Sequence, residues 1–163
     1  LSPEMKSTGE AIGYDDKLTR ALYKALKASG MSVMNYGTVL ATIADKDKAE
    51  ALPLIRRFYN MGFNIQATAG TAEFLKKNGI RTHTLKKISE GSDEIPDGIR
   101  QGYVNYVINT RDMNSSGVLS DGYEIRRLAV ENGVTMFTSL DTVRVLLDVL
   151  EEITLGISTI DAE

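Results

Sequence analysis

Hydroxyl and cationic side chains gather where predicted strands end, and this combination is typical of a phosphate-binding site. The motif Thr68-Ala69-Gly70-Thr71 offers two hydroxyls and a glycine at the start of a predicted helix, and Lys48 and Lys87 follow the neighbouring strands. Backbone N–H groups at a helix N-terminus bind phosphate together with such donors and counter-charges. Singly, each residue has a structural explanation, because a threonine often caps a helix and lysines are usually solvated. Together they predict a phosphate or nucleotide site.

This site is neither an NTPase site nor a dinucleotide site, because the sequence contains no P-loop and no G-x-G-x-x-G motif. The single histidine, His83, lies within a predicted strand, where we expect an ordinary strand histidine rather than a general base. The carboxylate pairs Asp93/Glu94 and Glu151/Glu152 are sequence neighbours that point apart, so they do not indicate a glycosidase.

Short β-branched or aromatic runs alternate with amphipathic helical patterns from Thr38 onward. Strands are predicted at residues 38–43, 63–68, 80–85, 103–109 and 134–138, and helices at residues 48–61, 71–78, 96–101, 121–132 and 140–153. Glycines follow the helices where C-caps are expected, at Gly62, Gly79, Gly102 and Gly133. The pattern predicts an α/β fold of three layers, with a five-stranded parallel sheet covered by helices on both faces. In such sheets ligands bind outside the carboxyl ends of the strands.

Residues 1–30 do not follow this alternation. Residues 1–14 contain no predicted strand, and residues 15–28 carry a helical stripe of apolar side chains. We therefore expect residues 1–30 to be the end of a preceding domain with a linker helix, and residues 31–163 to be the α/β domain. Leu1 is not a start methionine, so we expect the chain to be a piece of a longer one. Pro53 conflicts with the helix predicted around it, and we expect it near the first turn or at a kink.

Composition excludes several classes of protein. The 163 residues are 42% hydrophobic and 25% charged, as in an ordinary globular domain. The chain has no cysteine, which excludes disulfides, thiolate zinc sites and cysteine nucleophiles. No apolar run is long enough to span a bilayer, and residues 1–4, Leu-Ser-Pro-Glu, resemble no signal peptide. The net charge of −3 disfavours binding to nucleic acid, so we expect neither a nucleic-acid nor a membrane partner.

Two segments resemble a known family. Residues 3–10, Pro-Glu-Met-Lys-Ser-Thr-Gly-Glu, closely resemble the end of the second ATP-using half of carbamoyl-phosphate synthase large subunits. Residues 33–155 resemble the C-terminal regulatory domain of that subunit, which belongs to the methylglyoxal-synthase-like family with its Rossmann- or flavodoxin-like sheet. The resemblance implies an allosteric module that binds a nucleotide monophosphate such as UMP or IMP, and that itself holds no cofactor and no catalytic residues.

The same resemblance implies a parent enzyme and its partners. The parent is a cytoplasmic, glutamine-hydrolysing ligase that makes carbamoyl phosphate for pyrimidine and arginine biosynthesis, with ATP and Mg²⁺ or Mn²⁺ in its ATP-using halves. The implied partners are the catalytic domains of the same subunit, the glutaminase small subunit through the parent, and an oligomer contact.

Residue roles also follow from the resemblance. The phosphate-binding residues correspond to Lys48, Thr68, Gly70, Thr71 and Lys87. The nucleotide contacts correspond to Asn109, to Asp121 near the base or ribose, and to Thr42 as a small hydroxyl residue lining the pocket.

The sequence departs from the family at two places. Relatives often have two threonines after the asparagine, but this chain has Thr110-Arg111, and Arg111 either adds contacts to the effector or narrows the pocket. Met136 replaces a tyrosine of the ornithine site of some relatives, while the threonine of that site is retained as Thr138. Activation by ornithine is therefore not expected.

Two other functions are compatible with the same phosphate-binding residues, which we call the cradle (Lys48, Thr68, Gly70, Thr71 and Lys87). An active methylglyoxal synthase, a lyase acting on dihydroxyacetone phosphate, needs an aspartate base and a histidine where this chain has Ser92 and Val118. Neither side chain transfers a proton at neutral pH, and Asp93 is one residue out of place. The third alternative is an oligomerisation module with an empty cradle.

Overall fold

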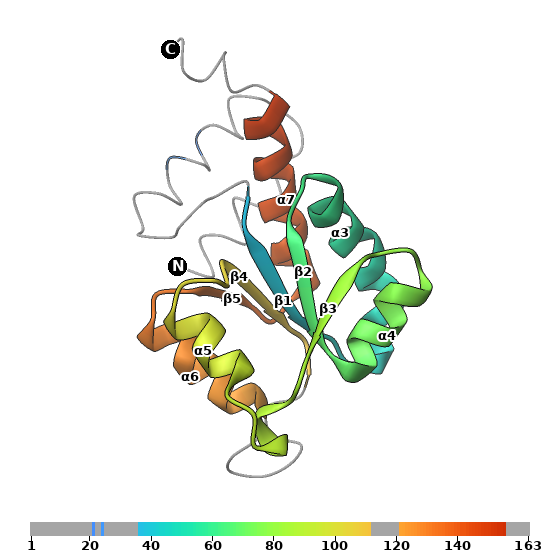
Figure 1. The fold of residues 1–163 in the computed structure, drawn as a ribbon. Helices are drawn as coiled ribbons and strands as arrows, with labels where there is room; N and C mark the ends of the chain where they lie inside the picture. The colour runs from blue at the N-terminus through green and yellow to red at the C-terminus, as the bar shows by residue number, and fades with distance from the viewer. Residues whose placement is uncertain (1–20, 22–23, 25–35, 112–120, 156–163) are drawn as a thin grey trace. The chain divides into compact units, whose positions relative to one another are not determined.

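Strands and helices alternate along the described chain as the sequence predicts (Figure 1). This computed structural model describes Ala21, Lys24, residues 36–111 and residues 121–155. The strands are β1 (Thr38–Thr42), β2 (Asn64–Thr68), β3 (Thr82–Leu85), β4 (Tyr106–Asn109) and β5 (Thr135–Phe137). The helices are α3 (Lys48–Asn60), α4 (Ala69–Lys77), α5 (Glu94–Arg100), α6 (Asp121–Glu131) and α7 (Leu140–Leu155), with 3₁₀ turns η2 (Asp45–Asp47) and η3 (Ile88–Glu90). Residues 36–140 form one compact unit, and residues 141–155 belong to a second.

The sheet has five parallel strands in the order β3-β2-β1-β4-β5. The chain therefore moves outward from β1 through β2 to β3 and then crosses back to place β4 on the other side of β1. At this reversal the last residues of the two central strands, Thr42 and Asn109, are paired in register. In parallel α/β sheets the crevice for a ligand opens at this point, outside the carboxyl ends of the strands.

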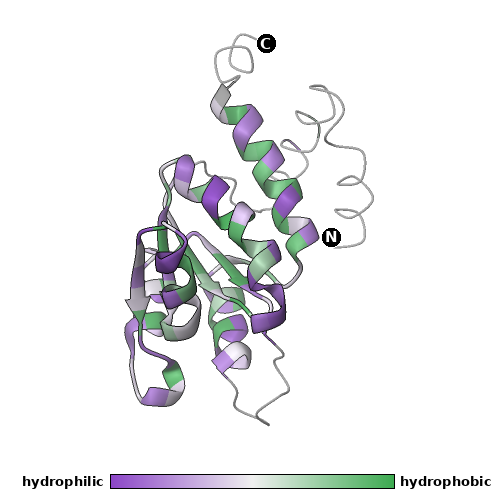
Figure 2. Cartoon of the chain, turned by 90° about the vertical axis from the view of Figure 1, so that its right-hand side faces the viewer, coloured by the Kyte–Doolittle hydropathy of each residue, from purple (hydrophilic) through white to green (hydrophobic). Residues whose placement is uncertain are grey.

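Helices cover both faces of the sheet, as Figure 1 shows for α3 and α4 on one face and for α5 and α6 on the other. All five residues of β1 are buried, because a central strand of a parallel sheet packs against helices on both sides. On the α5 and α6 face, Leu40 and Val107 pack in one apolar cluster with Ile99 and Ile125. Hydrophobic and hydrophilic residues alternate along the helices accordingly (Figure 2). The predicted three-layer α/β fold is confirmed.

Local signals in the sequence are reproduced at the helix ends. Positive φ angles occur at the four predicted C-cap glycines, with +99° at Gly62, +83° at Gly79, +79° at Gly102 and +67° at Gly133. Pro53 lies inside α3, beyond the first turn, and the helix continues through it to Asn60. This position removes the bond that a backbone N–H at residue 53 would donate to the Ala49 carbonyl.

The second unit contributes α7, in which Val143, Leu146, Leu147 and Leu150 are buried at helical spacing. Most of the predicted tail and linker helix, residues 1–20, 22–23 and 25–35, lies outside the described residues, as does the segment that resembles the ATP-using half. Ala21 and Lys24 are helical and exposed. No helix among the described residues is long and apolar enough to cross a membrane.

Gly37, just before β1, is a position where we expect a single methyl group to be costly. Its φ is +120°, and an added Cβ would lie 1.9 Å from Oδ1 of Asn105. That oxygen accepts a 2.7 Å hydrogen bond from the backbone N–H of Thr38. Gly37→Ala combines backbone strain with loss of this bond, so we expect the free energy of unfolding in urea to fall by about 2–4 kcal/mol.

Gly62→Ala is the matched control for this substitution. Gly62 has a φ of +99° and no atom within 4 Å of an added Cβ, so only strain of about 1–2 kcal/mol applies there. Equal losses in the two variants would show that the contact between residues 37 and 105 contributes nothing to stability.

Candidate functional site

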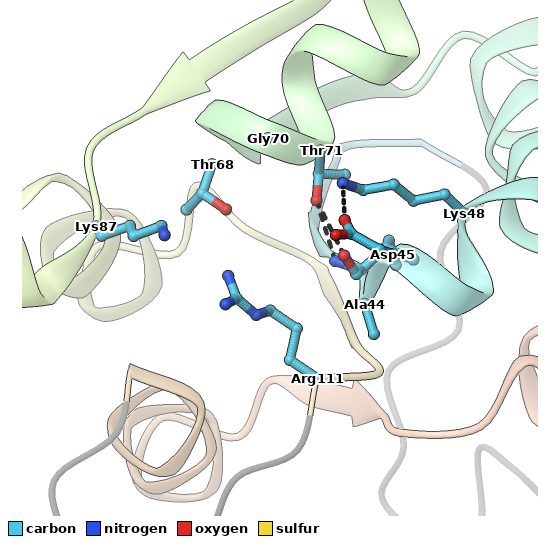
Figure 3. A pocket seen from close by; sticks show the side chains of 9 residues that line it. Ala44, Asp45, Lys48, Thr68, Gly70, Thr71, Lys87 and Arg111 are labelled. Atoms are coloured by element: carbon cyan, nitrogen blue, oxygen red, sulfur yellow. Dashed lines mark hydrogen bonds and ion pairs between the residues drawn. The ribbon is translucent and has the colours of Figure 1, made fainter. Parts of the chain in front are cut away.

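A pocket of about 340 Å³ opens at the carboxyl ends of β1, β2, β3 and β4 (Figure 3). The loops after these four strands supply its walls, so its position is the one that the strand order predicts. The lining residues are Ile43, Ala44, Asp45, Lys48, Thr68, Gly70, Thr71, Lys87 and Arg111. Six of these residues were expected from the sequence as phosphate or effector ligands.

Lys48 and Asp45 form the wall that follows β1. The Lys48 Nζ donates a 2.5 Å hydrogen bond to Oδ1 of Asp45 across one turn. The Lys48 side chain is only 18% exposed, whereas that of Asp45 is 94% exposed. This hydrogen bond and the charge of Lys48, with a smaller contribution from the Arg111 guanidinium, hold the pKa of the Asp45 carboxyl below its ordinary value. Asp45 therefore stays ionised at neutral pH.

The start of α4 forms the wall that follows β2. Thr68 is the N-cap residue, but its side chain makes no cap hydrogen bond, which leaves the amides of the first turn open to a ligand. The Thr71 Oγ1 accepts a 3.1 Å bond from the backbone N–H of Ile43, so this hydroxyl also ties α4 to the end of β1. A Cβ on Gly70 would lie 3.6 Å from the Lys48 Nζ. The Lys48 ammonium therefore lies directly beside the first turn of α4.

Lys87 and Arg111 complete the pocket from the loops after β3 and β4. Both side chains point into the same space as Thr68 in Figure 3. The Arg111 backbone N–H donates a 3.1 Å bond to Oδ1 of Asn109, which fixes the turn that carries the guanidinium. With Lys48, the pocket has three cations and one carboxylate, a formal charge of +2. A phosphomonoester, which carries about −1.5 to −2 at pH 7, has the matching charge.

Two expected residues are buried and do not line the pocket. Thr42 and Asn109, partners in register at the ends of β1 and β4, are 4% and 1% exposed. Among the described residues, only the Thr42 Oγ1 and the Asn109 Nδ2 are buried side-chain polar atoms without a hydrogen-bond partner. Such atoms are rare because leaving them unpaired costs about 1–3 kcal/mol.

Asp121 does not line the pocket. Its Oδ1 accepts a 3.0 Å bond from the backbone N–H of Ser89, and its Oδ2 accepts a 3.2 Å bond from the Ser89 Oγ. It is the first residue of α6, where the sequence predicts a helix to begin.

Of the two residues that the resemblance aligns with the catalytic positions of methylglyoxal synthases, Ser92 does not line the pocket. The Ser92 Oγ bonds to the backbone N–H and side chain of Glu94, and Asp93 precedes α5. Val118 lies outside the described residues. His83 is an exposed residue of β3, as expected.

The pocket also contains a residue that the sequence did not single out as a ligand. Asp45 lies three residues after the end of β1, and its only signal in the sequence is that it opens the polar segment Asp45-Lys46-Asp47-Lys48. Its neighbour Ala44 is fixed by a 3.0 Å bond from its backbone N–H to the Thr110 Oγ1. No group of three or more histidine, cysteine, aspartate or glutamate side chains suited to a metal ion occurs within residues 36–111 and 121–155.

The MGS-like domain model matches residues 50–138, which is more than half of the chain. The chain belongs to the MGS-like domain family. Among solved structures, this MGS-like domain is similar to the methylglyoxal synthase from Elizabethkingia anophelis NUHP1, with a TM-score of 0.57 and 17% sequence identity. The match covers 71% of this chain and 79% of that one. At this level of identity the similarity establishes a common fold.

Asp45 is expected to compete with a bound anion in this MGS-like domain. Asp45→Asn removes the carboxylate that pairs with Lys48, so we expect inorganic phosphate to bind about two- to fivefold more tightly, as for an exposed ion pair. Because the pKa of Asp45 is lowered, the wild-type carboxylate stays charged from pH 5 to 8. Within this range, the affinity for a phosphomonoester should rise with pH in both proteins as the ligand loses its second proton near pH 6.

Calorimetric titration checks this expectation, with Asp47→Asn as the matched control. Asp47 lies two residues further along, in η2, and does not line the pocket. A gain in affinity of the same size in both variants would point to net charge rather than to competition at Lys48.

Proposed function

We propose that this chain is the allosteric regulatory domain of a carbamoyl-phosphate synthase large subunit and that its pocket binds the phosphate of a nucleotide monophosphate such as UMP or IMP. The observation that carries the proposal is the convergence of Lys48, Lys87 and Arg111 on the open N-terminus of α4. The volume of about 340 Å³ is at the lower end of the range for small-molecule sites. The resemblance of residues 3–10 to the end of an ATP-using half supports the parent enzyme.

The arrangement favours binding over catalysis. Among the described lining residues, Asp45 is the only carboxylate, and an acid with a lowered pKa is a poor general base at neutral pH. Ser92 stands where methylglyoxal synthase needs its base, and its hydroxyl bonds to Glu94.

Titration calorimetry with UMP, IMP and inorganic phosphate tests the proposal. We expect a nucleotide to bind more tightly than phosphate alone, because the base and ribose add contacts beyond the cradle. The parent assignment is tested in the intact enzyme, where UMP or IMP should change the rate of ATP-dependent carbamoyl phosphate synthesis. If none of these ligands produces heat at millimolar concentration, the proposal is wrong, and an oligomerisation module with an empty cradle is the function that remains.

The lyase alternative has a separate readout. Methylglyoxal release from dihydroxyacetone phosphate should not exceed that of the double variant Ser92→Ala, Val118→Ala. A rate above that control would contradict the regulatory assignment and favour an active methylglyoxal synthase.

A further inference from the structure

Three carboxylates hold the turn that carries Lys87. The backbone N–H of Lys86 donates to Oε1 of Glu94 at 3.3 Å, and that of Lys87 donates to Oε1 of Glu90 at 3.0 Å. The N–H of Ser89 donates to Asp121 at 3.0 Å. Hydrogen bonds to charged acceptors are stronger than neutral ones, so these side chains fix the path of the chain from β3 through η3.

Asp121 differs from the other two carboxylates in where it comes from and in how it binds. It is the first residue of α6, whereas Glu90 belongs to η3 itself and Glu94 begins the helix that directly follows. Both of its oxygens accept a bond from Ser89, one from the amide and one from the hydroxyl at 3.2 Å. Its negative charge also lies at a helix N-terminus, where the helix dipole favours it. Asp121 thus anchors η3 to α6, across 32 residues of sequence.

We propose that Asp121 is a positioning residue, which holds the Ser89 turn and thereby aims Lys87 into the pocket without contacting the ligand. This inference rests on the proposed phosphate-binding function and replaces the base or ribose contact that the family resemblance implies for Asp121. Two observations carry it. Lys87 lines the pocket, but neither Ser89 nor Asp121 does. Both carboxylate oxygens of Asp121 already have partners within the protein.

A double-mutant cycle with inorganic phosphate as the ligand tests the coupling. Asp121→Ala should weaken phosphate binding about three- to tenfold in the wild-type background, because Lys87 is no longer held in place. In the Lys87→Ala background the same substitution should change the affinity by less than about 1.5-fold, since the side chain that it positions is gone. In a Lys48→Ala background, where Lys87 is still present, Asp121→Ala should keep its full three- to tenfold effect.

Equal losses in the wild-type and Lys87→Ala backgrounds would overturn the proposal, because Asp121 would then act on the ligand by a route that does not involve Lys87. If Asp121→Ala fails to fold, Ser89→Ala enters the same cycle, since it removes the donor to Oδ2 and leaves the carboxylate in place. A smaller loss that disappears in the Lys87→Ala background is then expected, and a loss that persists there would overturn the proposal.

A measurement without any ligand separates this inference from the proposed function. In Asp121→Ala, the amide proton resonances of Lys87 and Ser89 should shift, while that of Lys48 on the opposite wall should stay unchanged. Unchanged resonances at 87 and 89 would overturn the positioning role even if phosphate binds. If instead Lys87→Ala alone leaves phosphate affinity unaltered, the proposed cradle fails and the resonance shifts still decide whether Asp121 holds the turn.

Discussion

Lys48→Ala is expected to weaken the binding of UMP and of inorganic phosphate by about 5- to 150-fold. Removing a charge-assisted hydrogen bond costs about 1–3 kcal/mol, and each 1.4 kcal/mol is a factor of ten in affinity. We expect the cost for Lys48→Ala in the upper part of this range. The Lys48 side chain is only 18% exposed, so water screens its charge only in part. Its removal also leaves the Asp45 carboxylate without its partner in the pocket, where it repels an anion.

Lys46→Ala is the matched control for Lys48. Lys46 lies in η2, two residues before Lys48, and does not line the pocket. Lys46→Ala should change the affinity by less than about twofold at physiological salt, because Lys46 is exposed and salt screens exposed charges. The double variant Asp45→Asn, Lys48→Ala should recover part of the loss. Equal losses of affinity in Lys48→Ala and Lys46→Ala would show that the net charge of the protein, rather than the pocket, attracts the ligand.

Phe58→Ala is expected to lower the free energy of unfolding by about 3–5 kcal/mol, a large share of the 5–15 kcal/mol typical of a domain. The Phe58 ring, which is fully buried, stands edge-on to Phe63 at a centroid distance of 5.2 Å and lies 6.2 Å from the ring of Tyr106. Tyr106 in turn contacts Phe137, so this aromatic cluster joins α3 to β4 and β5. Removing one ring leaves a cavity that its rigid neighbours fill poorly.

Urea unfolding of Phe58→Ala and Tyr103→Ala provides the measurement and its control. Tyr103 is an aromatic residue that is 65% exposed before β4, so its truncation should change stability by no more than about 0.5 kcal/mol. A loss below about 2 kcal/mol for Phe58→Ala would mean that the cluster collapses around the missing ring.

The boundaries of the elements differ from the predicted ones for identifiable reasons. The helix expected from Thr71 begins at Ala69, because Thr68 is the cap residue. The strand expected from Tyr103 begins only at Tyr106. Asn105, within that stretch, bonds to Thr38 through its side chain and its backbone N–H and so connects the loop to the start of β1. Neither contact is visible in residue types and periodicity, because one partner is distant in the sequence.

The sequence by itself determined the alternation of strands and helices, the helix ends at Gly62, Gly79, Gly102 and Gly133, and the collection of hydroxyls and cations at the strand ends. Apolar periodicity and the permitted φ of glycine act over a few residues, so a sequence displays them directly. These features were sufficient to predict both the fold class and the edge of the sheet at which the pocket opens.

The tertiary structure alone decided which of the expected residues share one pocket. Thr42, Asn109 and Asp121 lie outside its lining, and Asp45 belongs to it. These positions depend on β4 returning to the far side of β1, and on the approach of α6 to η3 across 32 residues of sequence. Local propensity carries no information about such pairings, because they form only when the packed sheet brings distant segments within hydrogen-bonding distance.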